Sequence, residues 1–139
     1  MDHRPHWDHA KPMARLTIRV DFDSGASIGP GKIRLLEEVE ASGSIRKAAE
    51  ALNMSFRQSW LLLKAIEEMF GEPVIVTARG GVGGGGSALT ELGRLVVSNY
   101  RQLEREAALA GQVAITNLQA RIVAAPRTSK PLRKKMSRR

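Results

Sequence analysis

The sequence predicts a mainly α-helical fold with a small β component, and three observations support this. Residues 44–71 hold two short amphipathic segments, each preceded by a serine where a helix N-cap belongs. Residues 90–110 repeat apolar side chains at intervals of four and three, as a long helix does. Residues 14–22, 74–77 and 87–89 are short apolar or alternating segments next to Gly, Pro or Ser, which is typical of short strands.

The composition bounds the domain organisation. A chain of 139 residues can form one domain whose core needs no disulfide or metal. We expect a disordered tail over residues 1–13, a folded domain over residues 14–110, and a basic, mostly disordered tail over residues 111–139. The chain has no cysteine, no signal-peptide pattern and no apolar run of membrane-spanning length. We therefore expect a cytoplasmic protein with no membrane partner.

The net charge of +8 suggests a polyanionic partner, but the charge is unevenly distributed. Residues 14–110 contain twelve basic and twelve acidic residues, whereas residues 126–139 contain seven basic residues and no acid. The basic tail either binds phosphates without reading bases or is simply a solvated tail. Any surface for nucleic acid on the folded domain must therefore come from local segregation of charge.

The first expected elements are a strand and a helix. Residues 14–22 alternate, with Leu16, Ile18, Val20 and Phe22 on the face expected to be buried. Pro30 then opens a helix that ends at Gly43 in a C′ position, with an apolar face of Ile33, Leu35, Leu36, Val39 and Ala41. Glu37, Glu38 and Glu40 should make the exposed side of this helix repel phosphate.

Residues 44–71 indicate a helix-turn-helix. Ser44 and Ser55 are the expected N-caps, and Gln58 completes a capping box with Ser55. Only Asn53 and Met54 separate the two segments, so the helices must cross sharply over a shared core. We expect the second helix to bury Phe56, Trp60, Leu63, Ile66 and Phe70. A helical hairpin with no ligand is the alternative.

The glycine run of residues 80–86 is expected to link two short strands. Residues 74–77 form the first strand, and residues 87–89 return. Such a run can adopt φ > 0 and approach another backbone, so the hairpin beside the helix-turn-helix is interpreted as a wing. The alternative is a mobile loop without contacts.

A long helix capped by Thr90 follows, and it predicts a homodimer. A coiled-coil seam is expected to include Val96, Tyr100, Leu103, Ala107 and Ala110. Gly93 interrupts the first heptad, and the alternative is a helix that packs on its own domain. A second, weaker apolar pattern covers residues 113–123.

Other chemistries fit the sequence poorly, and no cofactor is expected. All three histidines, His3, His6 and His9, lie at the N-terminus, so the folded part offers no catalytic histidine. Residues 26–32 resemble a phosphate loop but are followed by Ile33 where the Ser or Thr that binds Mg²⁺ belongs, and the GxGxxG match at residues 81–86 opens no helix. The histidines suit metal binding in principle, but we favour a disordered polar terminus, because no packed face holds the three rings.

The predicted helix-turn-helix has side chains suited to binding double-stranded DNA and reading its bases. In a helix-turn-helix, the N-terminal residues of the second helix meet base edges in the major groove. Arg57 could pair with guanine and Gln58 with adenine, while Leu61 either meets thymine methyl groups or, as we favour, packs against another element. The full set of expected DNA contacts is Ser44, Arg46, Lys47, Ser55, Arg57, Gln58, Leu61, Lys64, Arg79, Gly83, Gly84 and Gly85.

Several motifs together resemble a known family. SGSIRKAAEALNMSFRQSW, MFGEPVIV, the glycine run and LTELGRLVV are similar, over residues 14–110, to the N-terminal winged-helix domain of ModE-type molybdate-responsive regulators. More distantly, they resemble the LysR-type DNA-binding domain. The resemblance implies a dimeric transcriptional regulator in which helix and wing grip DNA, linked to molybdenum or metal homeostasis.

The region after residue 110 departs from that resemblance. Full-length ModE-type regulators continue into molybdate-binding domains, whereas residues 111–139 here are mostly low in complexity. We therefore expect a stand-alone DNA-binding version with no small-molecule effector site in this chain. Two alternatives stay open. The first is a winged-helix module that binds protein, favoured by the neutral net charge of residues 14–110, and the second is a metal-handling accessory protein.

Overall fold

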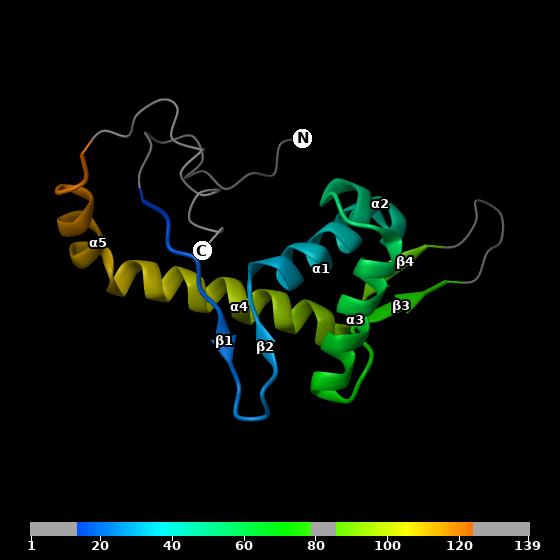
Figure 1. Ribbon diagram of the computed structural model, residues 1–139. Coiled ribbons are helices and arrows are strands. Elements are labelled where there is room, and N and C mark those ends of the chain that lie inside the picture. The colour runs from blue at the N-terminus through cyan, green and yellow to red at the C-terminus, as the bar shows by residue number, and fades with distance from the viewer. Residues whose placement is uncertain (1–13, 79–85, 124–139) are drawn as a thin grey trace, which may run out of the picture. The chain divides into compact units, whose positions relative to one another are not determined.

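The computed structural model describes residues 14–78 and 86–123 (Figure 1). It is mainly helical with two small antiparallel strand pairs, which confirms the predicted fold class. The elements in chain order are β1 (Val20–Asp21), β2 (Ser27–Ile28), α1 (Pro30–Ser42), α2 (Ile45–Ala51), α3 (Phe56–Phe70), β3 (Ile75–Thr77), β4 (Ser87–Leu89), α4 (Glu91–Ala110) and α5 (Gln112–Gln119).

Helix α1 is the centre of the core. It begins with Pro30 at its first position and ends at Gly43, whose φ of 73° lets the Gly43 N–H reach the Val39 carbonyl. Ile33, Leu35, Leu36 and Val39 are fully buried, and α1 contacts α2, α3, β2 and β4. Ala41, which was expected on this apolar face, is exposed.

Helices α2 and α3 form the predicted helix-turn-helix. The Ser44 hydroxyl caps α2 by accepting a hydrogen bond from Lys47 N at 3.0 Å. The predicted capping box is present on α3: Gln58 N donates to Ser55 Oγ at 3.0 Å, and Ser55 N donates to Gln58 Oε1 at 2.9 Å. Between the helices, Asn53 adopts a φ of 59°, a left-handed conformation that asparagine tolerates well. Local hydrogen bonds therefore set where both helices begin.

The predicted buried face of α3 is partly wrong. Leu63 and Ile66 are buried as expected, but Phe56, Trp60 and Phe70 are 40%, 45% and 39% exposed. Ser59 takes the inner position instead, fully buried, with its hydroxyl donating to the Phe56 carbonyl at 2.7 Å. Hydrophobic periodicity misses such a serine, because the hydroxyl is satisfied by its own helix and the small side chain lets the helices pack closely.

Two hairpins extend from the helical core (Figure 1). Strands β3 and β4 pair in the register Ile75–Leu89, Val76–Ala88 and Thr77–Ser87, and a further bond joins Ala78 N to the Gly86 carbonyl at 2.7 Å. The strand predicted over residues 14–22 is reduced to Val20–Asp21, paired with β2. Phe22 is exposed rather than buried, because the hairpin turn begins there, with Gly25 N bonded to the Phe22 carbonyl.

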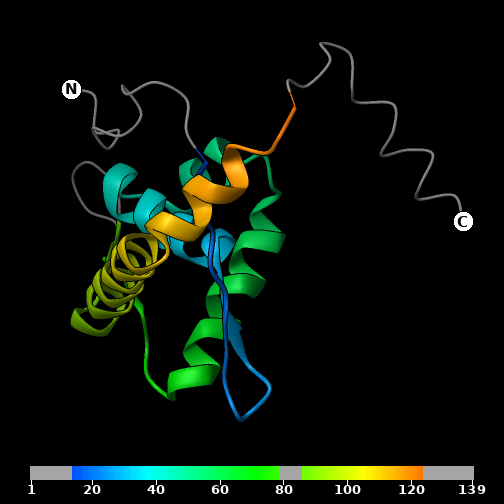
Figure 2. The same cartoon turned by 90° about the vertical axis from the view of Figure 1, so that its left-hand side faces the viewer.

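The first half of α4 packs into the same core. Figure 2 shows the structure turned by 90° from the view of Figure 1. Thr90 caps the helix, as predicted, by accepting from Gly93 N at 3.1 Å, and its hydroxyl donates to the Pro73 carbonyl. Val96 and Tyr100 are buried, and Tyr100 Oη donates to the Ile18 carbonyl at 2.7 Å. Burial raises the pKa of the Tyr100 phenol, so the neutral donor form is maintained.

An ion pair joins α4 to α1. Arg101 donates to both carboxylate oxygens of Glu37, at 2.9 and 2.8 Å, and to Glu104 at 2.7 Å. The hydrogen bonds to Glu37 raise the pKa of Arg101 further above its usual range, so this guanidinium keeps its charge.

Helix α5 is not part of the compact unit formed by residues 16–109. Its apolar residues Val113 and Leu118 are 73% and 69% exposed. None of the helices in the described ranges is long and apolar enough to cross a membrane.

Helix α4 lies too close to the Val74 backbone, just before β3, to accommodate a side chain at Gly93. A Cβ there would collide with the Val74 carbonyl oxygen and crowd the Leu89 side chain. We expect Gly93→Ala to lower the free energy of unfolding by about 1–3 kcal/mol, the usual cost of overpacking. Urea denaturation followed by circular dichroism measures this.

Gly31→Ala is the matched control, because a Cβ at Gly31 meets no atom within 4 Å. This control should be neutral or stabilising by about 0.5–1 kcal/mol. Equal stability of the two variants would contradict the close approach of α4 to Val74.

Candidate nucleic-acid interface

The outward side of α3 carries a short row of exposed side chains. Arg57, Leu61 and Lys64 follow one another at helical spacing, and Glu68 continues the row one turn later. Leu61 is 48% exposed, so the expectation that it packs against another element of this chain is wrong. Because the row ends in an acid, only the first two turns of α3 are suited to a polyanion.

The domain segregates its balanced charges. Two of the three acids of α1 are engaged by other elements: Glu37 pairs with Arg101 of α4, and Glu40 accepts from Leu89 N of β4 at 2.8 Å while lying 3.7 Å from Arg94 of α4. By contrast, Arg46, Lys47 and Arg57 are exposed and form no ion pair with any residue in the described ranges. Helix α2 and the start of α3 therefore carry three cations that no described acid neutralises.

Three of the expected contact residues already have structural roles. The hydroxyls of Ser44 and Ser55 accept helix-capping bonds, although each can still donate its proton to a phosphate. Gln58 Oε1 accepts from Ser55 N, so a bidentate pairing of Gln58 with adenine would have to share this oxygen. The amide nitrogen of Gln58 is the more available group for a partner.

Two aromatic side chains of α3, Phe56 and Trp60, each lie close to a cation. The Arg46 guanidinium lies 4.7 Å from the centre of the Phe56 ring, and Lys64 Nζ lies 5.3 Å from the centre of the Trp60 ring. Such contacts contribute roughly 0.5–1 kcal/mol at exposed sites and restrict where the cation points. Both rings thus help to position cations of the predicted set.

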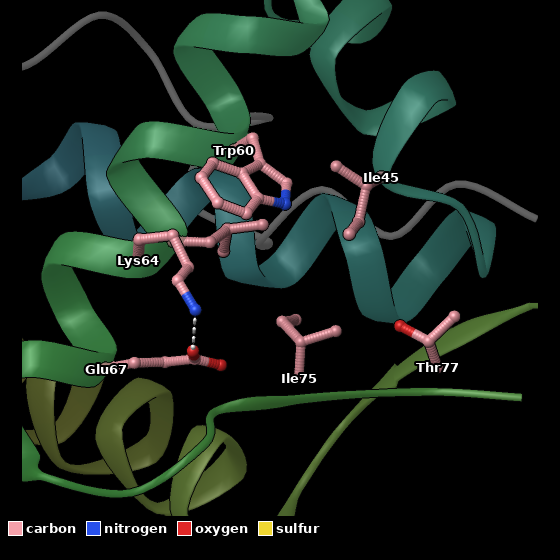
Figure 3. A pocket seen from close by; sticks show the side chains of 7 residues that line it. Ile45, Trp60, Lys64, Glu67, Ile75 and Thr77 are labelled. Atoms are coloured by element: carbon pink, nitrogen blue, oxygen red, sulfur yellow. Dashed lines mark ion pairs between the residues drawn. The ribbon is translucent and has the colours of Figure 1, made fainter.

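A hollow of about 130 Å³ lies between the Trp60 side of α3 and β3 (Figure 3). Trp60, Lys64 and Glu67 face it from α3, opposite Ile75 and Thr77 of β3, with Ile45 of α2 and Leu63 completing the lining. Lys64 Nζ lies 3.5 Å from Glu67 Oε1, and Glu67 Oε2 accepts from Val74 N at 3.1 Å. An aromatic face, a cation and a hydroxyl therefore surround one small opening.

The predicted wing is described only at its stem. Strands β3 and β4 form the antiparallel base, and Ser87 N is bonded to the Gly43 carbonyl at 2.8 Å, next to the start of α2. Arg79, Gly83, Gly84 and Gly85 lie outside the described residues.

The residues of the expected dimer seam on α4 differ in their burial. Val96 and Tyr100 are buried in their own domain, at 6% and 4% exposure, and are unavailable to a partner as they stand. Leu103 is 43% exposed, Ala107 is half-buried and Ala110 is exposed. Leu95 and Leu109 add exposed apolar surface outside the predicted seam.

Sequence reasoning did not single out Glu67 or Thr77, and it placed Phe56 and Trp60 in the core. A signal for Trp60 was available, because Lys64 follows it by four residues, the spacing at which side chains meet on a helix. The position of Thr77 depends on the hairpin crossing close to α3, for which the sequence holds no local signal.

Comparison with known proteins agrees with this geometry. The family model of bacterial regulatory helix-turn-helix proteins, lysR family, matches residues 31–94, which span α1 to the first turn of α4. The "Molybdenum transport protein ModE" of Azotobacter vinelandii is 38% identical over 94 residues, covering 68% of this chain and 34% of the relative.

Two further relatives give the same result. The "Transcriptional regulator ModE" of Haemophilus influenzae is 31% identical over 90 residues, covering 65% of this chain and 35% of that protein. The "DNA-binding transcriptional dual regulator ModE" of Escherichia coli K12 is 31% identical over 87 residues, covering 63% and 33%. The chain thus spans about a third of the length of these relatives. It resembles them over its folded domain.

Gln58→Glu should separate the capping role of Gln58 from a role in binding. Glutamate also completes a capping box, so stability should be unchanged or slightly higher. The added anion and the lost amide donor should weaken binding to duplex DNA by about 1–3 kcal/mol. Thermal denaturation and fluorescence anisotropy measure the two effects.

Gln112→Glu on α5 is the control, because it makes the same chemical change at an exposed residue of a different helix. If Gln58→Glu and Gln112→Glu weakened binding equally, Gln58 would not lie at the DNA interface.

Proposed function

We propose that this chain, which carries a ModE-like winged helix-turn-helix domain, is a DNA-binding transcriptional regulator that acts as a homodimer. The observation that carries the proposal is the group of exposed, unpaired cations on α2 and at the start of α3. The name of the relative in Escherichia coli also describes a DNA-binding regulator. Helix-turn-helix domains of this family are regulatory rather than catalytic, and a regulator of this kind works in the cytoplasm.

Helix α3 is the proposed recognition helix. Its N-terminal residues enter the major groove, where Arg57 pairs with guanine and the exposed Leu61 contacts a thymine methyl group. Arg46 and Lys47 bind phosphates and fix the register on the duplex, together with the Ser44 and Ser55 hydroxyls. The wing, through Arg79 and Gly83 to Gly85, contacts the backbone or minor groove.

The proposed dimer uses the exposed half of α4. Leu103, Ala107 and Ala110 continue the heptad seam beyond the residues that α4 buries in its own domain, and Leu109 broadens the apolar surface. A two-fold dimer presents two α3 helices about 34–36 Å apart, one turn of the duplex.

A link to molybdenum is proposed from the relatives, two of which are named as molybdenum-pterin-binding proteins and two as molybdenum transport proteins. The aligned region covers at most about a third of those proteins, so the link is one of regulatory context. No effector site within this chain is proposed.

Selection of bound duplexes from a random library tests the function. We expect an enriched motif with two symmetric half-sites about one helical turn apart. Mobility-shift competition at physiological salt should then favour the selected duplex over random DNA by at least about a thousandfold. A protein-binding module would give no enriched motif, and a single half-site would argue against the dimer.

Arg57→Ala should relax specificity at one base position. Removing a bidentate contact to guanine costs about 1–3 kcal/mol on the selected duplex and little on a duplex altered at that position. Arg34→Ala is the control, because it removes the same charge from the exposed side of α1. Equal losses on both duplexes would make Arg57 a phosphate contact instead.

A further inference from the structure

The hollow between α3 and β3 is shown in Figure 3. It adjoins the exposed row of Arg57, Leu61 and Lys64 on α3, which is proposed to meet the DNA. Lys64 belongs to both features, since it stands in the exposed row and also lines the hollow. The volume of about 130 Å³ is several times the ~10–15 Å³ of cavity space that one water needs, so the space admits a small polar group.

Lys64 and Glu67 differ in how firmly they are held. Glu67 is anchored, because its side chain is 22% exposed and Oε2 accepts from Val74 N. The Lys64 side chain is 49% exposed, and among the described residues its ammonium contacts the Glu67 carboxylate, at 3.5 Å, and the Trp60 ring. An exposed pair of this kind contributes only about 0.2–1 kcal/mol, so Lys64 can leave Glu67 when a stronger anion arrives.

This inference rests on the proposed function, which predicts what part of the DNA lies at the hollow. With α3 in the major groove and the wing over the neighbouring groove, the strand of sugar and phosphate between the grooves must pass between α3 and the wing. Thr77, the last residue of β3, and Trp60 on α3 stand on the two sides of that passage.

We propose that this hollow is a seat for one sugar–phosphate unit of the DNA backbone. Lys64 exchanges Glu67 for the phosphate, the Thr77 hydroxyl donates to a phosphate oxygen, and the exposed face of Trp60 packs on the deoxyribose. Glu67 is a positioning residue that holds Lys64 at the opening and lowers affinity by competing with the phosphate.

A charge-matched comparison tests the role of Glu67. Glu67→Gln keeps a carbonyl oxygen for Val74 N but removes the ion pair, and Glu68→Gln makes the same charge change one residue away on α3. Glu67→Gln should tighten binding to a random-sequence duplex about two- to fivefold more than Glu68→Gln does. The difference should disappear in a Lys64→Met background. Equal effects of the two substitutions, or a difference that persists without Lys64, would overturn the exchange.

Trp60 provides an independent readout. The chain has two tryptophans, Trp7 and Trp60, so Trp7→Phe leaves Trp60 as the single reporter. Acrylamide is neutral and should quench Trp60 in the free protein, because the side chain is exposed. Bound duplex should reduce the quenching constant at least about twofold if the backbone covers the ring. Unchanged quenching in the presence of bound duplex would overturn the seat.

The two proposals fail in different ways. If no duplex binds the protein, the regulatory function and the phosphate seat are both overturned. If duplex binds while Trp60 stays open to acrylamide and Glu67→Gln matches Glu68→Gln, only the seat is overturned.

Discussion

The apolar face of α1 is the surface on which the rest of the domain depends. Its four fully buried residues contact both helices of the helix-turn-helix, and the face also borders β2 and β4. Burying apolar surface contributes roughly 25 cal/mol per Å², so this shared face couples the stability of the elements packed on it. Helix α3 can present exposed leucine, aromatic and basic side chains because Leu63 and Ile66, on its other side, secure it to the core.

The same helix organises the charge. Two carboxylates of α1, Glu40 and Glu37, pair with Arg94 and Arg101 of α4. Arg46, Lys47 and Arg57, on α2 and α3, form no ion pair within the described residues. A domain that is neutral in total can in this way attract a polyanion on one side.

Backbone contacts decide how closely the wing stem approaches the helices. Gly93 lets α4 lie against the Val74 carbonyl, and the Ser87 N–H reaches the Gly43 carbonyl at the end of α1. With these contacts β3 lies across from α3, where Thr77 and Trp60 line a common hollow. The proposed phosphate seat is thus a product of packing between α3 and β3, whereas the bond that anchors Glu67 joins residues only seven apart in the sequence.

Local rules in the sequence determined where helices α1 to α4 meet their caps, but not the bounds of the first strand or the presence of α5. Ser44, Ser55 with Gln58, Gly43 and Thr90 define helix boundaries through bonds to neighbouring backbone groups, so no distant residue was needed to predict them. The resemblance to ModE-type regulators rested on the same short segments, and the matched relatives agree with it. What only the tertiary structure decided was which apolar residues face inward. Phe56 and Trp60 share the helical spacing of Leu63 and Ile66, but close packing buries Ser59 in their place. Val96 and Tyr100 fit a dimer seam by spacing and are instead buried in their own core. The reason is physical: periodicity records that a residue is apolar, whereas burial depends on the shape of the surface that meets it.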